Sequence, residues 1–215
     1  MSKRLRVLAG LAGVATLLAA CSRGLPSTFA VYRGEGYSVA YPGDWKGCHG
    51  RVPLAGGEAP AVEVSGPAGR QQVVPPIVQV ANEGTERNFD HALNFHRLLL
   101  QVNPGYKQLA EEDVDVSGAK RAVRIEFEQE YPFSVGQSRP RIHGVNLLAE
   151  APNGGVVSVL ASATVPDFER LKETFDDVLR SLAVGSEIDQ STRVSPNLPA
   201  CSTQASPEPS PSPSG

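Results

Sequence analysis

The sequence holds few of the side chains from which metal and redox centres are built. Among 215 residues there are three cysteines and four histidines, and neither a His-x-Glu nor a Cys-x-x-Cys spacing occurs. His91 and His96 are the closest histidines in a helical pattern, but five residues turn a helix by about 500°, so they fall on different faces. His96 is expected either to snorkel or to hydrogen-bond at the edge of an apolar stripe. The four histidines are His49, His91, His96 and His143, and none of them has the spacing of metal ligands. We therefore expect no metal site and no cofactor.

Motifs of nucleophilic catalysis are also missing. No Gly-x-Ser-x-Gly elbow occurs, and the nearest segment, Val116 to Gly118, is typical of a turn between strands. Cys48 precedes His49, but adjacent side chains on an extended segment point to opposite sides. Gly154 and Gly155 separate two apolar runs instead of preceding a helix, so they predict no phosphate loop. The sequence favours a protein that is not an enzyme.

The longest apolar run lies at the beginning of the chain and is too short to cross a membrane. Lys3, Arg4 and Arg6 precede the mostly apolar residues 7–20. As a helix these reach roughly 21 Å, whereas the hydrocarbon core of a bilayer measures about 30 Å. A charged start followed by a short apolar stretch is typical of a signal peptide, which is how we interpret residues 1–20.

The end of this segment, Leu18-Ala19-Ala20-Cys21, resembles the bacterial lipobox. In lipoproteins the small residues fit the signal peptidase, and the cysteine sulfur carries diacylglycerol. Several acyl chains supply more than the two hydrophobic signals that stable anchoring needs. We therefore predict lipidation at Cys21 and a location on the extracytoplasmic face of a bacterial cell membrane. The alternative is ordinary secretory cleavage, with Cys21 as a chance thiol.

Basic residues are too few to suggest a nucleic-acid partner. Without residues 1–20, the 20 basic side chains fall to 17 against 23 acidic ones, a net charge of −6. Such a charge disfavours nucleic acid and anionic lipid surfaces. Glu126, Glu128 and Glu130 recur at every second position, and we interpret them as the solvated face of a strand.

Two cysteines, Cys48 and Cys201, remain after lipidation. An even number of cysteines outside the cytoplasm makes a disulfide a candidate. Such a bond would close a loop of about 150 residues, which the chain-entropy model values at about 5 kcal/mol. Two independent thiols are the alternative, because Cys201 lies in a tail rich in serine and proline.

Four regions follow from composition. Residues 1–20 are the signal peptide and residues 21–29 a lipidated tether. Residues 30–184 are long enough for one domain with its own core, and no repeat or internal linker interrupts them. Residues 185–215 are rich in serine and proline, bury little apolar area, and are expected to be disordered.

The N-terminal part of the predicted domain shows short strand signals. Apolar residues alternate between Tyr37 and Tyr41 before a Pro42-Gly43 turn, and further signals follow at residues 62–64 and 77–80. The glycine- and proline-rich stretch 46–70 is interpreted mostly as loop.

The C-terminal part predicts two helices and an antiparallel sheet. Helical spacing occurs over residues 88–102 and again from Phe168 to Leu182, where Pro166 stands near the start. Residues 123–130 alternate like a strand with one apolar face. The apolar runs 142–149 and 156–163 flank a Pro-Asn-Gly-Gly turn and predict a hairpin of central strands.

Two of these segments resemble those of a known fold group. Gly36 to Trp45 places a Tyr-Pro pair at the end of a strand with tryptophan shortly after, and Phe168 to Leu182 ends in a Ser-Leu pair. The order of elements resembles the group of PsbP, the Ran-binding Mog proteins and the actinobacterial lipoprotein LpqN. The resemblance covers residues 30–184 and implies an α+β fold, an antiparallel sheet packed with two main helices in an α/β/α sandwich. Because fold does not determine function, it implies no functional residue.

These observations lead to an expected function. The leading hypothesis is a membrane-anchored lipoprotein that acts as a non-catalytic binding or assembly factor for an envelope protein. The alternative is a carrier of lipid or another small hydrophobic molecule. A deep apolar pocket between helix and sheet would favour the carrier, and an exposed apolar patch would favour the partner protein.

Overall fold

A computed structural model describes residues 28–54, 57–67, 74–85, 88–131, 139–185 and 198–201. The predicted signal peptide, Cys21 and most of the predicted tail lie outside these ranges. Among the described residues, no helix has the length and apolar character to cross a membrane.

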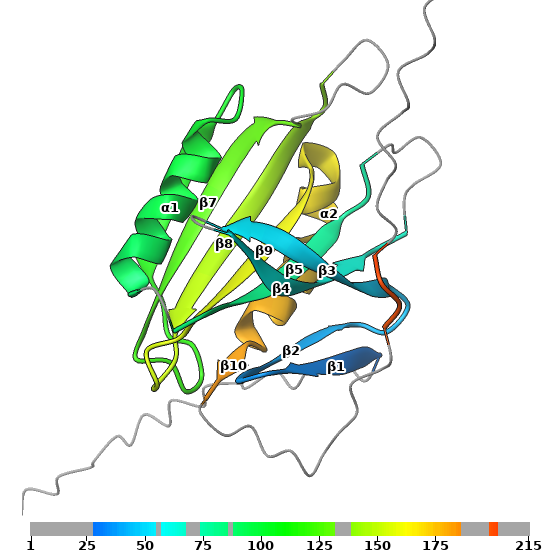
Figure 1. Cartoon of the computed structure of the whole chain (residues 1–215). Helices are drawn as coiled ribbons and strands as arrows, with labels where there is room; N and C mark the ends of the chain where they lie inside the picture. The colour runs from blue at the N-terminus through cyan, green and yellow to red at the C-terminus, as the bar shows by residue number, and fades with distance from the viewer. Residues whose placement is uncertain are drawn as a thin grey trace, which may run out of the picture.

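The described chain forms one large sheet, one small sheet and two helices (Figure 1). In chain order the elements are β1 (Phe29–Gly34), β2 (Tyr37–Pro42), β3 (Lys46–Leu54), β4 (Gly57–Ser65), β5 (Ile77–Gly84), α1 (Phe89–Gln101), β6 (Lys107–Asp113), β7 (Arg121–Glu130), β8 (Arg141–Glu150), β9 (Val156–Thr164), α2 (Val165–Arg180) and β10 (Ala183–Val184).

The large sheet is antiparallel and has the strand order β3-β4-β5-β9-β8-β7-β6. Its centre is the predicted hairpin of β8 and β9, in which residues 142–150 pair with residues 156–164. Strands β8 and β9 are buried along nearly their whole length, as expected for strands covered on both faces. The predicted α+β class with two main helices is confirmed.

A second, smaller sheet has the order β1-β2-β10 and was not predicted. Strand β2 pairs with β1 on one side, and on the other Ser38 and Tyr37 pair with Ala183 and Val184 of β10. The beginning and end of the domain therefore meet in one sheet, which closes the core on the α2 side.

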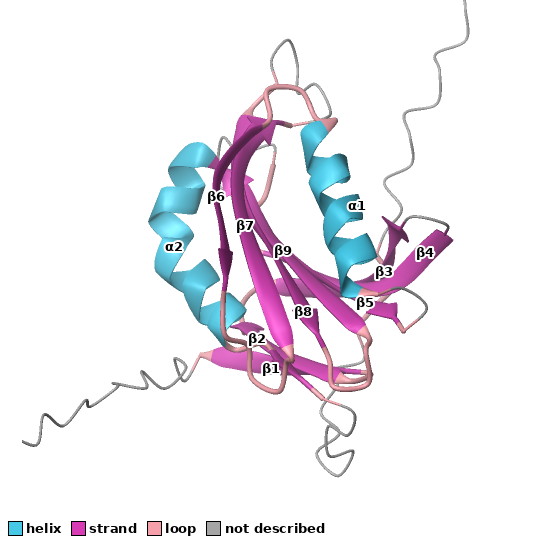
Figure 2. Cartoon of the chain, turned by 90° about the vertical axis from the view of Figure 1, so that its left-hand side faces the viewer, coloured by secondary structure: helices cyan, strands magenta, loops and turns pink. Residues whose placement is uncertain are grey.

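The two helices lie on opposite faces of the large sheet (Figure 2). On one face α2 and the small sheet enclose a core that includes Trp45, Phe168 and Phe175. On the other face α1 packs Phe89 and Leu93 against a second core. The molecule thus has the α/β/α layering that the sequence predicts.

Helix α1 forms where the apolar spacing was noted. Its N-cap is Asn88, whose side-chain oxygen accepts a hydrogen bond from the backbone N–H of His91 at 2.9 Å. Four side chains face the sheet, namely Phe89, Ala92, Leu93 and Leu100. The helix is therefore attached by one narrow stripe.

The two segments that carry the fold-group resemblance touch each other. Trp45 lies edge-on to Phe175 of α2, with ring centroids 6.0 Å apart. The backbone N–H of Ala40 donates to the hydroxyl of Ser181 at 2.8 Å. The Tyr-Pro strand and the Ser-Leu helix end are thus parts of one packing arrangement.

The prediction of a loop over residues 46–70 was wrong for most of that stretch. Strands β3 and β4 form a hairpin in which every residue from Lys46 to Leu54 is paired. Pro60 is tolerated because β5 pairs with β4 only from Ala61 onward, so the missing N–H breaks no bond of that ladder. Because this stretch is rich in glycine and proline, its two strands near the sheet edge were not predicted.

Candidate functional site

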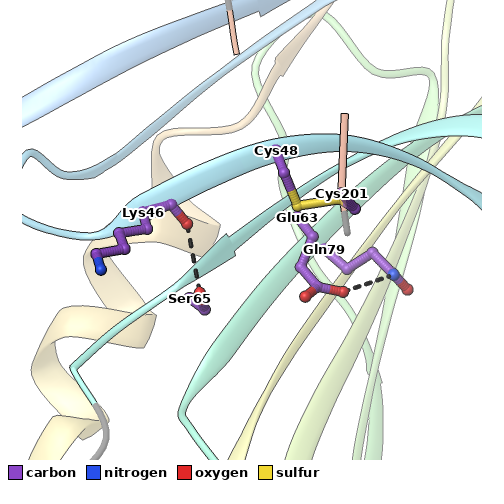
Figure 3. Close-up of a disulfide and its surroundings, with 6 residues drawn as sticks. All are labelled: Lys46, Cys48, Glu63, Ser65, Gln79 and Cys201. Carbon is purple, nitrogen blue, oxygen red and sulfur yellow. Dashed lines mark hydrogen bonds between the residues drawn. A yellow bond between two sulfur atoms is a disulfide. The ribbon is translucent and has the colours of Figure 1, made fainter. Parts of the chain in front are cut away.

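The structure describes two of the three cysteines to which the sequence assigned a role. Cys21, the predicted lipidation site, lies outside the described residues. Cys48 of β3 and Cys201 form a disulfide with a sulfur–sulfur distance of 2.02 Å (Figure 3). The backbone N–H of His49 donates to Pro199, and that of Cys201 donates to His49, both at 2.7 Å. Residues 198–201 therefore lie along the outer edge of β3 (Figure 1).

The disulfide marks one end of a row of side chains across the α1 face of the sheet. Cys48 pairs with Glu63, Glu63 with Gln79, and Gln79 with Leu160 on successive strands. Asn146 of β8 is the next partner of Leu160. Directly paired residues share a face, so the row leads from the disulfide to the sheet beneath α1. Figure 3 shows the amide of Gln79 pointing toward the carboxylate of Glu63.

A cavity of about 330 Å³ lies between α1 and this face. We call it the α1 cavity. Its apolar walls are Val52, Ala81, Leu99, Leu100, Val102, Phe127, Ile142 and Leu160. Its polar side chains are Gln79, His96, Asn103, Gln129, Asn146, Ser158 and Ser162. Ligand pockets commonly combine mainly apolar walls with a small set of polar groups in this way.

The cavity exists because the sheet carries small side chains beside the contact area of the apolar stripe of α1. The apolar stripe of α1 packs mainly on Val123, Ile125 and Phe127 of β7 and on Leu148 of β8. Ala81 of β5 lies opposite Ser158 of β9. Gly144 of β8 lies opposite Ser162, and a side chain there would collide with the ring of Phe127. Gly144 thus admits the ring of Phe127, whereas the alanine and the serines leave space that larger residues would fill.

Three polar side chains at the cavity are joined by hydrogen bonds. The Nε2 of His96 lies 2.6 Å from Oε1 of Glu83, whose side chain is fully buried. The Nδ1 of His96 lies 2.8 Å from Nδ2 of Asn146. An amide nitrogen can only donate, so Nδ1 accepts and Nε2–H donates to the carboxylate. His96 thus hydrogen-bonds beside the apolar stripe, as its position in the sequence indicated.

Two carbonyl oxygens on the sheet have no hydrogen-bond partner among the described residues. They are Oδ1 of Asn146 and Oε1 of Gln129, and both belong to buried, cavity-lining residues. Buried polar atoms are almost always paired in folded proteins. The two oxygens are therefore free to accept hydrogen bonds from a group in the cavity.

The opposite face of the sheet contains a second polar cluster. Glu126 of β7 accepts hydrogen bonds from Arg124 at 2.6 Å and from His143 at 2.9 Å. The ring of His143 stacks on Phe168 of α2. Burial alone would raise the pKa of Glu126, but the bonds from Arg124 and His143 outweigh it and lower that pKa. The cluster links the sheet to α2.

The interpretation of the acidic ladder as a solvated face was therefore wrong, because the face is half-buried. The side chain of Glu126 is 17% exposed and that of Glu128 is 22% exposed. Each has a cation beside it, since Arg141 lies 2.6 Å from Glu128. Helix α2 covers part of this face, and a single-strand pattern does not reveal that.

The α2 side also has a shallower hollow of about 380 Å³. It lies between α2 and the strand β7, and it is lined by Val114, Asp115, Val116, Arg124, Leu147, Asp176, Leu179 and Arg180. Charges of both signs stand along its walls. Within the described ranges, no three histidine, cysteine, aspartate or glutamate side chains are grouped as metal ligands.

No protein-family model matches the chain, and no curated protein matches its sequence. Solved structures with a similar fold exist. Cyanobacterial PsbP from Synechocystis is 16% identical, with a TM-score of 0.46, and the match covers 78% of this chain and 98% of that one.

Two further solved structures are similar. LpqN, which is involved in cell envelope biogenesis of Mycobacterium tuberculosis, is 13% identical with a TM-score of 0.45, over 69% of this chain and 82% of that one. PA94, a protein of unknown function from Pseudomonas aeruginosa, is 14% identical with a TM-score of 0.41, over 71% and 94%. Likenesses at these identities and TM-scores say nothing about a ligand or a partner of this chain.

Sequence reasoning missed the α1 cavity, although one signal for it was present. Asn146 interrupts the apolar run 142–149, and Ser158 and Ser162 interrupt the run 156–163. Polar residues in strands covered on both faces need partners or a ligand. The sequence contains no such signal for Glu83 and His96, because their contact joins two separate elements, β5 and α1.

Proposed function

We propose that the chain is a non-catalytic binding protein that carries a small, mainly apolar ligand in the α1 cavity. The observation that carries the proposal is the cavity itself, which has about 330 Å³ of space behind a helix attached by one stripe. This volume falls within the range of known ligand sites. The runner-up of the sequence interpretation thus becomes the leading function.

The state of His96 supports a role in binding over one in catalysis. A general base needs a free nitrogen within hydrogen-bonding reach of its substrate. Both ring nitrogens of His96 are engaged, one with Glu83 and one with Asn146. The imidazole therefore holds α1 against the sheet and shapes the cavity wall.

We further propose that the protein works at the extracytoplasmic face of the membrane through lipid on Cys21. The support is the lipobox-like segment ending at Cys21. The disulfide between Cys48 and Cys201 also supports it, because such bonds persist in oxidising compartments outside the cytoplasm. Intact mass spectrometry on the full chain and on Cys21→Ala tests this, since only the former should carry the mass of acyl chains.

The carrier proposal is tested by native mass spectrometry of the full chain released from its native membranes. We expect one bound small molecule per chain in the unmodified protein. Ala81→Leu should reduce that mass, because Ala81 lines the cavity and the larger leucine side chain narrows it. The matched control is Ala110→Leu on β6, which lies in the same sheet outside the cavity walls.

Two results would contradict the carrier. One is the same ligand occupancy in Ala81→Leu and in the control. The other is a chain that carries no ligand and also fails to bind added N-phenyl-1-naphthylamine, a neutral apolar probe whose fluorescence rises in apolar pockets. Circular dichroism of both variants separates loss of binding from loss of fold.

An envelope protein as partner is the second candidate function. It is favoured by the last turns of α1, where Leu98 is 60% exposed and Val102 is 75% exposed. Neighbouring exposed apolar side chains are typical of interaction sites. Leu98→Gln should reduce crosslinking to a co-purifying protein and leave the bound ligand in place, because Leu98 is outside the cavity walls. Unchanged crosslinking would exclude this surface.

A further inference from the structure

We propose that the α1 cavity selects ligands whose polar group donates hydrogen bonds, such as a hydroxyl or an amide N–H, and rejects anionic groups such as carboxylate. The inference rests on the proposed carrier function and adds the chemical class of its ligand. It follows from the hydrogen-bonding state of the polar atoms in the cavity wall.

Asn146 is the first of these groups. Its side chain is 3% exposed and lies in the centre of β8 between Leu160 and Ile125. The amide nitrogen is committed to Nδ1 of His96 at 2.8 Å. Oδ1 is left without a partner among the described residues and can only accept. A donor on the ligand would satisfy it.

Gln129 is the second group and stands on a different strand. It is 6% exposed, pairs with Ile142 across β7 and β8, and lines the cavity. Its Oε1 also has no partner among the described residues. Ile125, the partner of Asn146, and Gln129 are four residues apart along β7, about 13 Å. The two oxygens are therefore separate acceptors in the cavity wall, and a donor can satisfy either one.

The charges near the cavity disfavour an anion. The described lining residues include neither lysine nor arginine. Next to the lining residues, on the same face of the sheet, stand the carboxylates of Glu83, bonded to His96, and of Glu63, bonded to Gln79. A carboxylate or phosphate would be desolvated there without a compensating cation. The hydroxyls of Ser158 and Ser162 can donate or accept, so they do not reverse this preference.

Four ligands with the same apolar chain test the proposal. They are 1-octanol and octanamide, which donate hydrogen bonds, methyl octanoate, which only accepts, and octanoate, which is anionic at neutral pH. Titrations of the full chain, followed by native mass spectrometry, give a dissociation constant for each. We expect the two donors to bind about tenfold more tightly than the ester, since each satisfies a buried acceptor. Octanoate should bind most weakly.

Substitutions assign the preference to its residues. Asn146→Leu, close in shape, removes one of the two acceptors and should reduce the advantage of octanamide over the ester. Gln129→Met tests the second acceptor and leaves the contacts of His96 intact, so it is informative even if Asn146→Leu fails to fold. Gln108→Leu, on the exposed face of β6, is the control and should retain the full preference.

The outcomes separate this inference from the carrier function. Equal affinities for donors, ester and octanoate would overturn the selectivity and leave the carrier intact. Tighter binding of octanoate than of octanol would overturn the selectivity in the same way. Failure of all four ligands, including in competition with N-phenyl-1-naphthylamine, would overturn both proposals.

Discussion

His96 of α1 and Glu83 of β5 form a contact of 2.6 Å beneath the helix, and the carboxylate side chain is fully buried. Removing one member of a buried pair destabilises a protein by about 3 kcal/mol or more. We expect His96→Leu to lower the free energy of unfolding by that amount. His91→Leu, exposed on the same helix, should change it by less than about 0.5 kcal/mol. Urea denaturation measures both, and similar values would contradict the role of the contact.

Gly118 should tolerate no side chain. It has a φ of +78°, and a Cβ there would collide with the carbonyl oxygen of Val184 in β10. Val184 N–H donates to Ser117 at 2.9 Å, so the collision would separate β10 from the β6–β7 turn. We expect Gly118→Ala to cost about 3 kcal/mol, from the left-handed backbone and the overlap together.

Gly154 provides the control for Gly118. Its φ of +86° is equally left-handed, but no atom lies near an added Cβ. Gly154→Ala should cost only the backbone term of about 1 kcal/mol. Equal losses in the two variants, measured by thermal or urea denaturation, would show that the contact with Val184 adds nothing.

The disulfide should contribute strongly to stability. Cys48 and Cys201 are separated by 153 positions in the sequence. The chain-entropy model assigns such a link about 5 kcal/mol as an upper value. We expect Cys48→Ser with Cys201→Ser to lower the urea midpoint markedly, and reductant to have the same effect on the unmodified chain. Reductant should have no effect on the double variant, and any effect there would contradict this assignment.

Glu126 should make stability depend on pH on the acid side. Its pKa is lowered in the folded protein, so its stabilising contribution is complete above the ordinary value of about 4.5. That contribution is lost as pH falls through the lowered pKa, because the unfolded chain then binds more protons than the folded one. Glu126→Gln should flatten the decrease in melting temperature below about pH 4.5. An unchanged slope would assign the decrease to other carboxylates.

Local patterns predicted the elements whose burial repeats along the chain. Phe168, Phe175 and Val178 form the stripe of α2, and Ile125 and Phe127 lie on the buried face of β7. Whether a side chain in these elements is buried depends on the one layer against which the element packs. The hairpin of β8 and β9 was equally clear, because turn residues separate two apolar runs.

Features that depend on distant segments could not be predicted. The β3 edge is covered by residues 198–201, and β10 joins β2 across more than a hundred residues. The cavity needs small residues on β5 and β9 to coincide beneath a helix from another part of the chain. No window of neighbouring residues contains such a combination. The sequence therefore shows Asn146 as a polar residue in an apolar run, but it does not show which side chain Asn146 contacts.

The disulfide also determines how the domain responds to mechanical force. Between Cys48 and Cys201 the chain forms a covalent loop that contains strands β4 to β10 and both helices. Tension between the two ends of the chain would pass directly from one sulfur to the other. Only β1, β2 and the start of β3 lie outside the loop and can be pulled out. All residues that line the α1 cavity, from Val52 to Ser162, lie inside the loop, so tension between the chain ends would leave the cavity intact.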